Sequence, residues 1–138
     1  MTAAIRLVPG LREAEARHAI MEALRADTRA KHDGGRRPLT FVLRQDGAFV
    51  GGLVGQTFMG WLAVDGLWVA AEHRGRGHAT ALMARAEDEA RARGATDCVL
   101  DTFSFQAPDF YRKLGYRDFA RLDGFPAGHR RHYMTKSL

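Results

Sequence analysis

The sequence of 138 residues contains a single cysteine, Cys98, so no disulfide can form within the chain. A lone thiol is typical of a reducing compartment, and we expect a cytoplasmic protein. No apolar run approaches the roughly 18 residues that span a bilayer. The first residues, MTAAIRLVPG, lack the long apolar segment of a secretion signal. The sequence therefore predicts neither a secreted protein nor a membrane partner.

Low-complexity segments and internal repeats are also missing. The composition, 46% apolar and 27% charged, is that of an ordinary globular protein. A chain of this length can bury a substantial core within one domain. We expect a single domain over residues 1–138.

The basic balance, a net charge of +5 and a pI near 10.0, permits binding to nucleic acid or to a ligand that carries phosphates. The basic residues are scattered, however. The expected helix over residues 79–93 intersperses them with Glu87, Asp88 and Glu89, a pattern typical of a solvated, self-neutralising face. The charge pattern therefore predicts no nucleic-acid partner.

A second basic stretch, residues 129–132, raises the question of a metal. In a strand, His129 and His132 would lie on opposite faces because side chains alternate. No cluster of Cys, Asp or Glu at ligand spacing accompanies them. We predict no metal and expect these residues to face solvent.

Hydrophobic periodicity and turn residues predict a mixed α/β protein. Antiparallel strands come first and an α/β crossover follows, which implies a mixed sheet. Asp46-Gly47 is a strong hairpin signal, and Asp65-Gly66 suggests a bulge within a strand. The expected strands cover residues 4–8, 39–45, 49–59, 61–70, 97–103, 116–121 and 132–136, and the expected helices cover 11–30, 79–93 and 109–114.

The most informative segment is the glycine-containing loop at residues 74–79, between an apolar strand and a helix. Gly75 and Gly77 allow close backbone approach, and the first N–H groups of the helix lack partners within the helix. The positive end of the helix dipole adds attraction, and Arg74 and Arg76 supply forked donors. The loop is predicted to bind a pyrophosphate. A dinucleotide-binding half-domain is disfavoured, because the third glycine and the downstream acidic residue are missing.

Two separated motifs resemble those of the GCN5-related N-acetyltransferase (GNAT) superfamily. The stretch 69–79, VAAEHRGRGHA, is similar to its acetyl-CoA loop. The stretch 104–116, SFQAPDFYRKLGY, resembles its late strand–helix–strand segment. The resemblance covers nearly the whole chain. It implies a mixed, mostly antiparallel sheet of six to seven strands, splayed in the middle and flanked by about four helices.

The resemblance also implies roles for single residues. Acetyl-CoA would be the co-substrate, its pyrophosphate held by backbone amides of residues 74–79 and its pantetheine arm paired with the strand near Trp68. Tyr111 would protonate the departing thiolate. Ser104 stands where the family commonly has an asparagine that contacts the cofactor. The predicted cofactor-binding residues are Trp68, Val69, Arg74, Gly75, Arg76, Gly77, His78, Ala79 and Ser104.

The general base is left open between two carboxylates. Asp101 interrupts the apolar stretch 98–103, and a carboxylate in a buried strand needs a partner or a function. Asp65 lies on the preceding strand, although Asp65-Gly66 is also a turn dipeptide. A mechanism without a dedicated base is the third possibility.

The function implied is transfer of an acetyl group to a primary amine, on a small molecule or a protein, directly within a ternary complex. Cys98 lies too deep in its strand to carry an acyl group. The alternative is a non-catalytic acetyl-CoA sensor or interaction module on the same fold. A homodimer is also possible, because dimers are frequent in the family. The sequence does not identify the acceptor.

Overall fold

The computed structural model describes residues 2–138. The chain divides into two compact units, Met1–Gly34 and Gly35–Leu138. The second unit contains every strand and both motifs found in the sequence.

Helix α1 (Arg12–Lys31) makes up most of the first unit and confirms the helix predicted over residues 11–30. Glu13 lies in its first turn and Lys31 in its last. A negative charge at the start and a positive charge at the end interact favourably with the helix dipole. The strand predicted over residues 4–8 is wrong, because these residues have no regular secondary structure. A strand needs a neighbour that takes its backbone hydrogen bonds, and local β propensity does not supply one.

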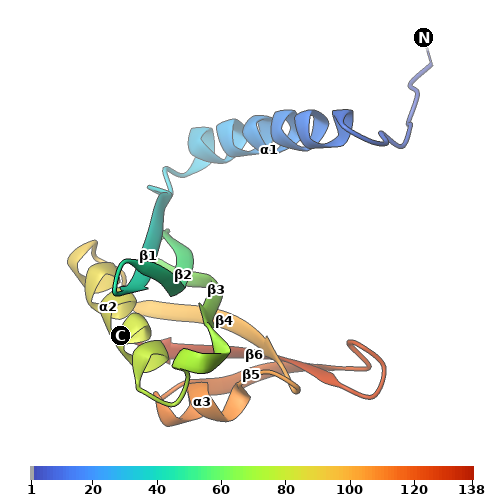
Figure 1. The fold of residues 1–138 in the computed structure, drawn as a ribbon. Helices are drawn as coiled ribbons and strands as arrows, with labels where there is room; N and C mark the ends of the chain where they lie inside the picture. Colours follow the sequence, from blue (N-terminus) through green and yellow to red (C-terminus); the bar gives the residue numbers. More distant parts are fainter. Residues whose placement is uncertain (1) are drawn as a thin grey trace. The chain divides into compact units, whose positions relative to one another are not determined.

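The second unit is built on a six-stranded sheet of order β1-β2-β3-β4-β6-β5 (Figure 1). Neighbouring strands run antiparallel except β3 and β4, which run parallel, so the sheet is mixed and mostly antiparallel as expected. The strands are β1 (Arg37–Gln45), β2 (Ala48–Phe58), β3 (Trp61–Val69), β4 (Asp97–Phe103), β5 (Arg117–Asp123) and β6 (Arg130–Ser137).

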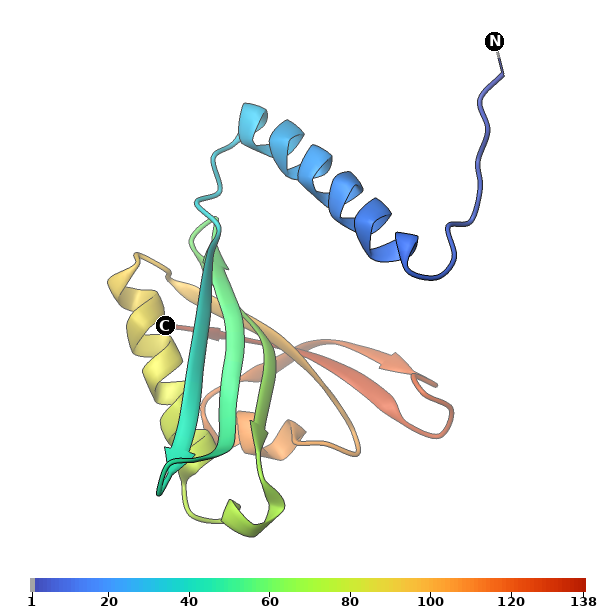
Figure 2. The same ribbon diagram turned by 45° about the horizontal axis from the view of Figure 1, so that its top comes forward.

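Two helices and a short turn connect the strands of this unit. A 3-10 turn, η1 (Ala71–His73), leads from β3 to α2 (His78–Ala92), and α3 (Pro108–Lys113) joins β4 to β5. Figure 2 shows α2 alongside the half of the sheet formed by β1 to β3. Proline opens α3, where its missing N–H costs nothing.

The core forms where the apolar stripe of α2 meets the sheet. Met83, Ala86 and Ala90 are fully buried, in one cluster with Leu53 and Leu62 of the strands. Small alanines allow close approach of helix and sheet, and apolar burial supplies the main stabilising term. Cys98 belongs to the same cluster, which confirms the prediction of a buried thiol.

Glu87 corrects the expected solvated face of α2, because it is buried with only 5% of its surface exposed. Its carboxylate accepts hydrogen bonds from the Tyr116 hydroxyl at 2.9 Å and from Lys136 Nζ at 2.7 Å. The acidic run therefore divides, because Glu87 is buried, Glu89 is half-buried and Asp88 is exposed.

His132 is a second correction. It was expected to face solvent, but 6% of its surface is exposed, and its Nδ1 lies 3.5 Å from Asp118 Oδ2. His129, by contrast, is exposed. His129 precedes β6, which begins at Arg130, so the expected alternation between the two histidines within one strand does not apply.

Candidate active site

A cavity of about 240 Å³ lies where β3 passes through the glycine loop into α2. Gly77 precedes the helix with φ +82°, a left-handed conformation that glycine adopts without steric cost. The first helical bond runs from the Ala81 N–H to the Gly77 carbonyl. Within residues 2–138, the N–H groups of residues 75–80 have no hydrogen-bond partner. The lining residues are Val69, His73, Arg74, Gly75, Gly77, His78, Ala79, Thr80 and Phe110.

Arg74 braces this loop. Its Nε donates to the Val69 carbonyl at 2.8 Å, and its backbone N–H donates to the Ala71 carbonyl at 3.3 Å. The amide of Arg74, predicted to be open, is thus already paired, whereas the amide of Thr80, which was not predicted, is open, so the open amides are those of residues 75–80. Arg76 is exposed and lies outside the lining of the cavity that the described residues form.

The two central strands separate next to this loop. In the part of the chain that the structure describes, β3 and β4 pair only between 61–63 and 97–99. Past these residues the edge of β3 is unpaired, as the predicted splay requires. A cavity of about 190 Å³ lies in the opening, lined by Val64, Asp65, Gly66, Leu67, Leu100, Asp101, Thr102, Gln106, Ala107 and Tyr111.

Three predicted catalytic residues meet at this second cavity: Tyr111, Asp65 and Asp101. The Tyr111 ring is buried in the core, edge-on to Tyr116. Its hydroxyl makes no hydrogen bond to another part of residues 2–138, and the residue lines the cavity. Burial, reinforced by the proximity of Cys98 and Asp101, raises the pKa of Tyr111 to about 12. The phenol therefore keeps its proton at neutral pH.

Asp65 is the extra residue of a β-bulge. Val54 pairs with Gly66 and Gly55 pairs with Val64, so Asp65 has no partner of its own across the strands. The bulge confirms the expectation raised by Asp65-Gly66. Bulges re-aim side chains beside active sites. Here the Asp65 carboxylate accepts a hydrogen bond of 3.3 Å from Gln56 Nε2, a neutral donor.

Asp101 has a charged partner instead. Its Oδ1 accepts a hydrogen bond of 2.9 Å from Arg131 Nε, and both side chains are partly exposed. The carboxylate raises the pKa of Arg131, whose guanidinium stays charged. The two candidate bases thus differ in the partner that an incoming ammonium group would have to replace. At Asp101 this partner is the charged Arg131, and at Asp65 it is the neutral side-chain amide of Gln56.

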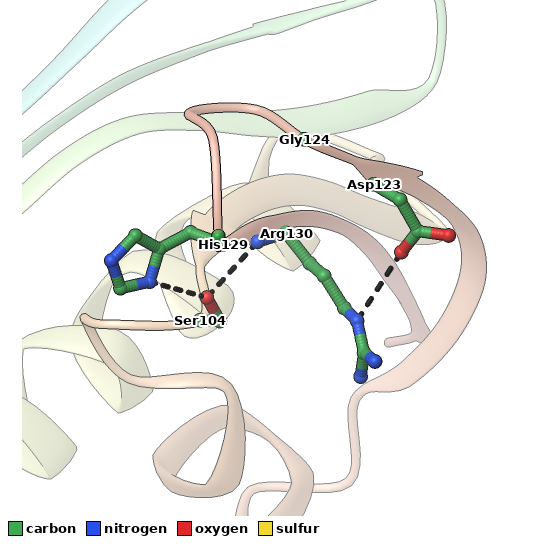
Figure 3. A pocket seen from close by; sticks show the side chains of 6 residues that line it. Ser104, Asp123, Gly124, His129 and Arg130 are labelled. Carbon is green, nitrogen blue, oxygen red and sulfur yellow. Dashed lines mark hydrogen bonds and ion pairs between the residues drawn. The ribbon is translucent and has the colours of Figure 1, made fainter.

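Ser104 lines a different cavity, of about 430 Å³, at the hairpin between β5 and β6. Its Oγ accepts a hydrogen bond of 3.0 Å from the Arg130 backbone N–H and pairs with His129 Nδ1 at 3.2 Å. Figure 3 shows these contacts, with the Arg130 side chain turned toward Asp123. The Ser104 hydroxyl is therefore held by the chain itself, and its predicted contact with the cofactor stays a prediction.

Several residues of both cavities were not found from the sequence. His73, Thr80 and Phe110 line the loop cavity, and Gln106 lines the second one. Gln56, which lines neither cavity but donates a hydrogen bond to Asp65, was also missed, although the hairpin between β2 and β3 places it opposite Ala63, two residues before Asp65.

Within residues 2–138 no group of three potential metal-binding side chains is present. No helix in that range has both the length and the apolar character needed to cross a membrane.

Comparison with known proteins identifies the class to which this fold and these cavities belong. The model of the acetyltransferase (GNAT) family matches residues 8–116. The chain belongs to this family.

Individual relatives agree with the family match. The blasticidin-S acetyltransferase of Streptomyces morookaense is 43% identical over 109 residues, 74% of this chain and 79% of that protein. Acetyltransferase Atu2258 of Agrobacterium fabrum is 37% identical over 118 residues, 84% and 86% of the two chains. A crystal structure assigned as an acetyltransferase from Agrobacterium tumefaciens is 33% identical, covers 100% of both chains and has a TM-score of 0.88. The protein is thus an acetyltransferase enzyme of this family.

Homologues of this fold have been crystallised with acetyl coenzyme A or coenzyme A bound. The residues present here suit such a ligand on physical grounds. Open amides at residues 75–80 offer donors to a diphosphate, and the unpaired edge of β3 past residue 63 offers backbone groups to an extended amide chain.

Proposed function

We propose that this protein transfers the acetyl group of acetyl-CoA directly to a primary amine of a small molecule. The observation that carries the proposal is the succession of two cavities along β3 and α3. One has open backbone amides, and the other brings together a protonated phenol and two carboxylates. The first matches a diphosphate, and the second matches proton transfer at an amine and a thiolate.

In this scheme acetyl-CoA supplies an acetyl group activated as a thioester. The amides of residues 75–80 bind its diphosphate, and the edge of β3 aligns its pantetheine arm with the opening between β3 and β4. Val69 and Leu67, which belong to the linings of the first and second cavity, place the reacting carbon near Tyr111. Alignment of this kind supplies much of the acceleration in a two-substrate reaction.

The two proton transfers fall to different residues. Asp65 takes a proton from the acceptor's ammonium group, because its hydrogen-bond partner is neutral whereas Asp101 is paired with Arg131. The freed amine forms a C–N bond to the acetyl carbon as the C–S bond breaks, and the nitrogen then loses its second proton to solvent, to which Asp65 also releases the first. Tyr111 donates its proton to the departing thiolate and regains one from solvent. The products are the acetylated amine and free coenzyme A.

The acceptor proposed first is blasticidin S, because the enzyme that is 43% identical to this chain is a blasticidin-S acetyltransferase. The test is release of free thiol from acetyl-CoA by the purified protein, with blasticidin S and with a panel of aminoglycosides, polyamines and amino acids. Mass spectrometry of the product must show one added acetyl group on nitrogen. Turnover with an amine of the panel but not with blasticidin S would show that blasticidin S is not the acceptor and that this amine is a better candidate.

A variant separates the proposed base from its rival. Asp65→Asn should lower kcat by about 10²-fold at pH 7 and by less at pH 9, where more of the amine is already deprotonated. Asp101→Asn should not show this pH-dependent recovery. The opposite pattern would assign the base to Asp101, and failure to release thiol with any amine would overturn the proposed function.

A further inference from the structure

Arg131 is held in a fixed position beside the second cavity. Its guanidinium carbon lies 5.3 Å from the ring centre of Phe103, 5.0 Å from that of Phe125 and 5.2 Å from that of Tyr133. Its Nε donates to Asp101. Strand register explains the arrangement, since Phe103 lies opposite Arg131, and Asp101 lies opposite Tyr133, across β4 and β6.

The guanidinium uses only part of its donor capacity in these contacts. Among residues 2–138, the hydrogen bond from Nε is the only one that the side chain makes, which leaves both terminal nitrogens unpaired. The side chain is 27% exposed, and neither terminal nitrogen is among the buried polar atoms without a partner. The terminal nitrogens of the guanidinium are therefore open to solvent, while three rings around its carbon and a carboxylate at Nε fix its position.

An open guanidinium fork matches a planar anion, which it binds with two parallel hydrogen bonds. Because the arginine is already immobilised, little side-chain entropy is lost on binding. Its partner Asp101 lines the cavity that also holds Asp65 and Tyr111. A ligand bound at the fork would thus lie one side chain, that of Asp101, away from the space where the amine reacts.

We propose that Arg131 binds a carboxylate of the acceptor, so that preferred acceptors carry both a reactive amine and a carboxylate. This inference rests on the proposed acetyl transfer. Arg131 positions the acceptor and takes no part in proton transfer. The carboxylate and Asp101 would occupy different edges of one guanidinium, whose charge offsets their mutual repulsion.

The test compares amino acids with their primary amides as acceptors of acetyl groups. The amino acid should have a KM at least about tenfold lower than its amide, with similar kcat. Arg131→Ala should abolish this preference, and Arg131→Lys should retain part of it, because a lysine keeps the charge without the fork. Arg121→Ala, at an exposed arginine of β5 that pairs with Asp123, is the matched control and should keep the full preference.

A binding experiment separates this inference from the proposed function. Sodium benzoate, benzamide, inorganic phosphate and benzamidine are titrated into the wild-type protein and into Arg131→Ala, and amide chemical shifts are followed. Of the four compounds, only benzoate should change the amide chemical shifts of Phe103 and Tyr133, and it should do so only in the wild-type protein. This result would support the binding of a carboxylate by Arg131 even if no amine were acetylated.

Three results would contradict the binding of a carboxylate by Arg131 without contradicting the proposed acetyl transfer. They are an equal KM for acid and amide, a stronger response to phosphate than to benzoate, and tighter binding of benzamidine after Arg131→Ala. The last would show that the rings and Asp101 receive a cation that Arg131 merely displaces. Cofactor affinity provides a further check, because Arg131→Ala should leave the dissociation constant of coenzyme A unchanged.

Discussion

Glu87 of α2 and Tyr116, which immediately precedes β5, are joined by a hydrogen bond of 2.9 Å between two buried side chains. Lys136 of β6 donates to the other oxygen of the same carboxylate at 2.7 Å. Burial and the neighbouring carboxylate raise the pKa of Tyr116, so this phenol keeps its proton and donates a hydrogen bond to Glu87. The contact joins α2, whose first residues have open amides, to β6 and to the start of β5.

Removal of this carboxylate should destabilise the fold. Glu87→Ala leaves the buried Tyr116 hydroxyl and the Lys136 ammonium without their partner, at a cost of about 3 kcal/mol in the free energy of unfolding. Urea denaturation followed by circular dichroism measures this cost. Asp88→Ala, at the neighbouring exposed position, is the control and should change stability by less than about 0.5 kcal/mol. Equal midpoints for the two variants would show that Glu87 contributes nothing by its burial.

The glycine loop allows a matched pair of backbone substitutions. Gly77 (φ +82°) and Gly47 (φ +80°) have the same left-handed conformation, and an added Cβ would meet nothing within 4 Å at either position. Alanine at either site should therefore cost about 1 kcal/mol of stability through backbone strain alone. Only Gly77→Ala should also weaken acetyl-CoA binding, by about tenfold, because it reorients the amides of residues 75–80. Calorimetric titration measures the affinity, and an equal affinity in both variants would place the diphosphate elsewhere.

Local signals in the sequence were sufficient for the elements that position the site. Asp46 and Gly47 both have positive φ in the turn between β1 and β2, as their dipeptide predicts. The bulge at Asp65 and the left-handed Gly77 also follow from side-chain chemistry within a few residues. Such features depend on backbone geometry that glycine and aspartate favour locally, so they can be read without knowledge of the fold.

The missed features depend on partners that are far apart in the chain. Glu87 is buried because Tyr116 and Lys136 come from other elements. The pairing of Asp101 with Arg131 requires the register of β4 against β6, which the sequence alone did not provide. The pattern of apolar and charged residues shows which face of a helix or strand is apolar and which is polar. It does not show which charged side chain will find a counter-charge across the sheet.

The phenol of Tyr111 can be tested separately from its ring. Tyr111→Phe keeps the packing against Tyr116 but removes the proton that the thiolate would receive, so kcat should fall by about 10²-fold or more. The dissociation constant of acetyl-CoA should change little. Tyr116→Phe is the matched control, because it also removes a buried hydroxyl but should lower stability and leave kcat nearly unaffected. Unchanged turnover in Tyr111→Phe would remove this residue from the chemistry.

The raised pKa of Tyr111 also predicts how stability depends on pH. Burial sets this pKa at about 12 in the folded protein, against an ordinary value of 10.0 for an exposed phenol. Below pH 10 both states keep the proton, so the phenol has no effect on the pH dependence. Between pH 10 and 12 the unfolded chain releases its proton first, which favours unfolding. The free energy of unfolding should therefore fall as pH rises through this window, by about 2 kcal/mol from Tyr111.

Cys98 shifts stability in the same direction, because burial raises its pKa to about 12 as well. The contribution of Tyr111 is therefore isolated as the difference between wild type and Tyr111→Phe. Urea denaturation at pH 8, 10, 11 and 12 should show a shallower decline for the variant. Parallel curves for the two proteins would mean that the Tyr111 hydroxyl is as well solvated in the folded state as in the unfolded chain.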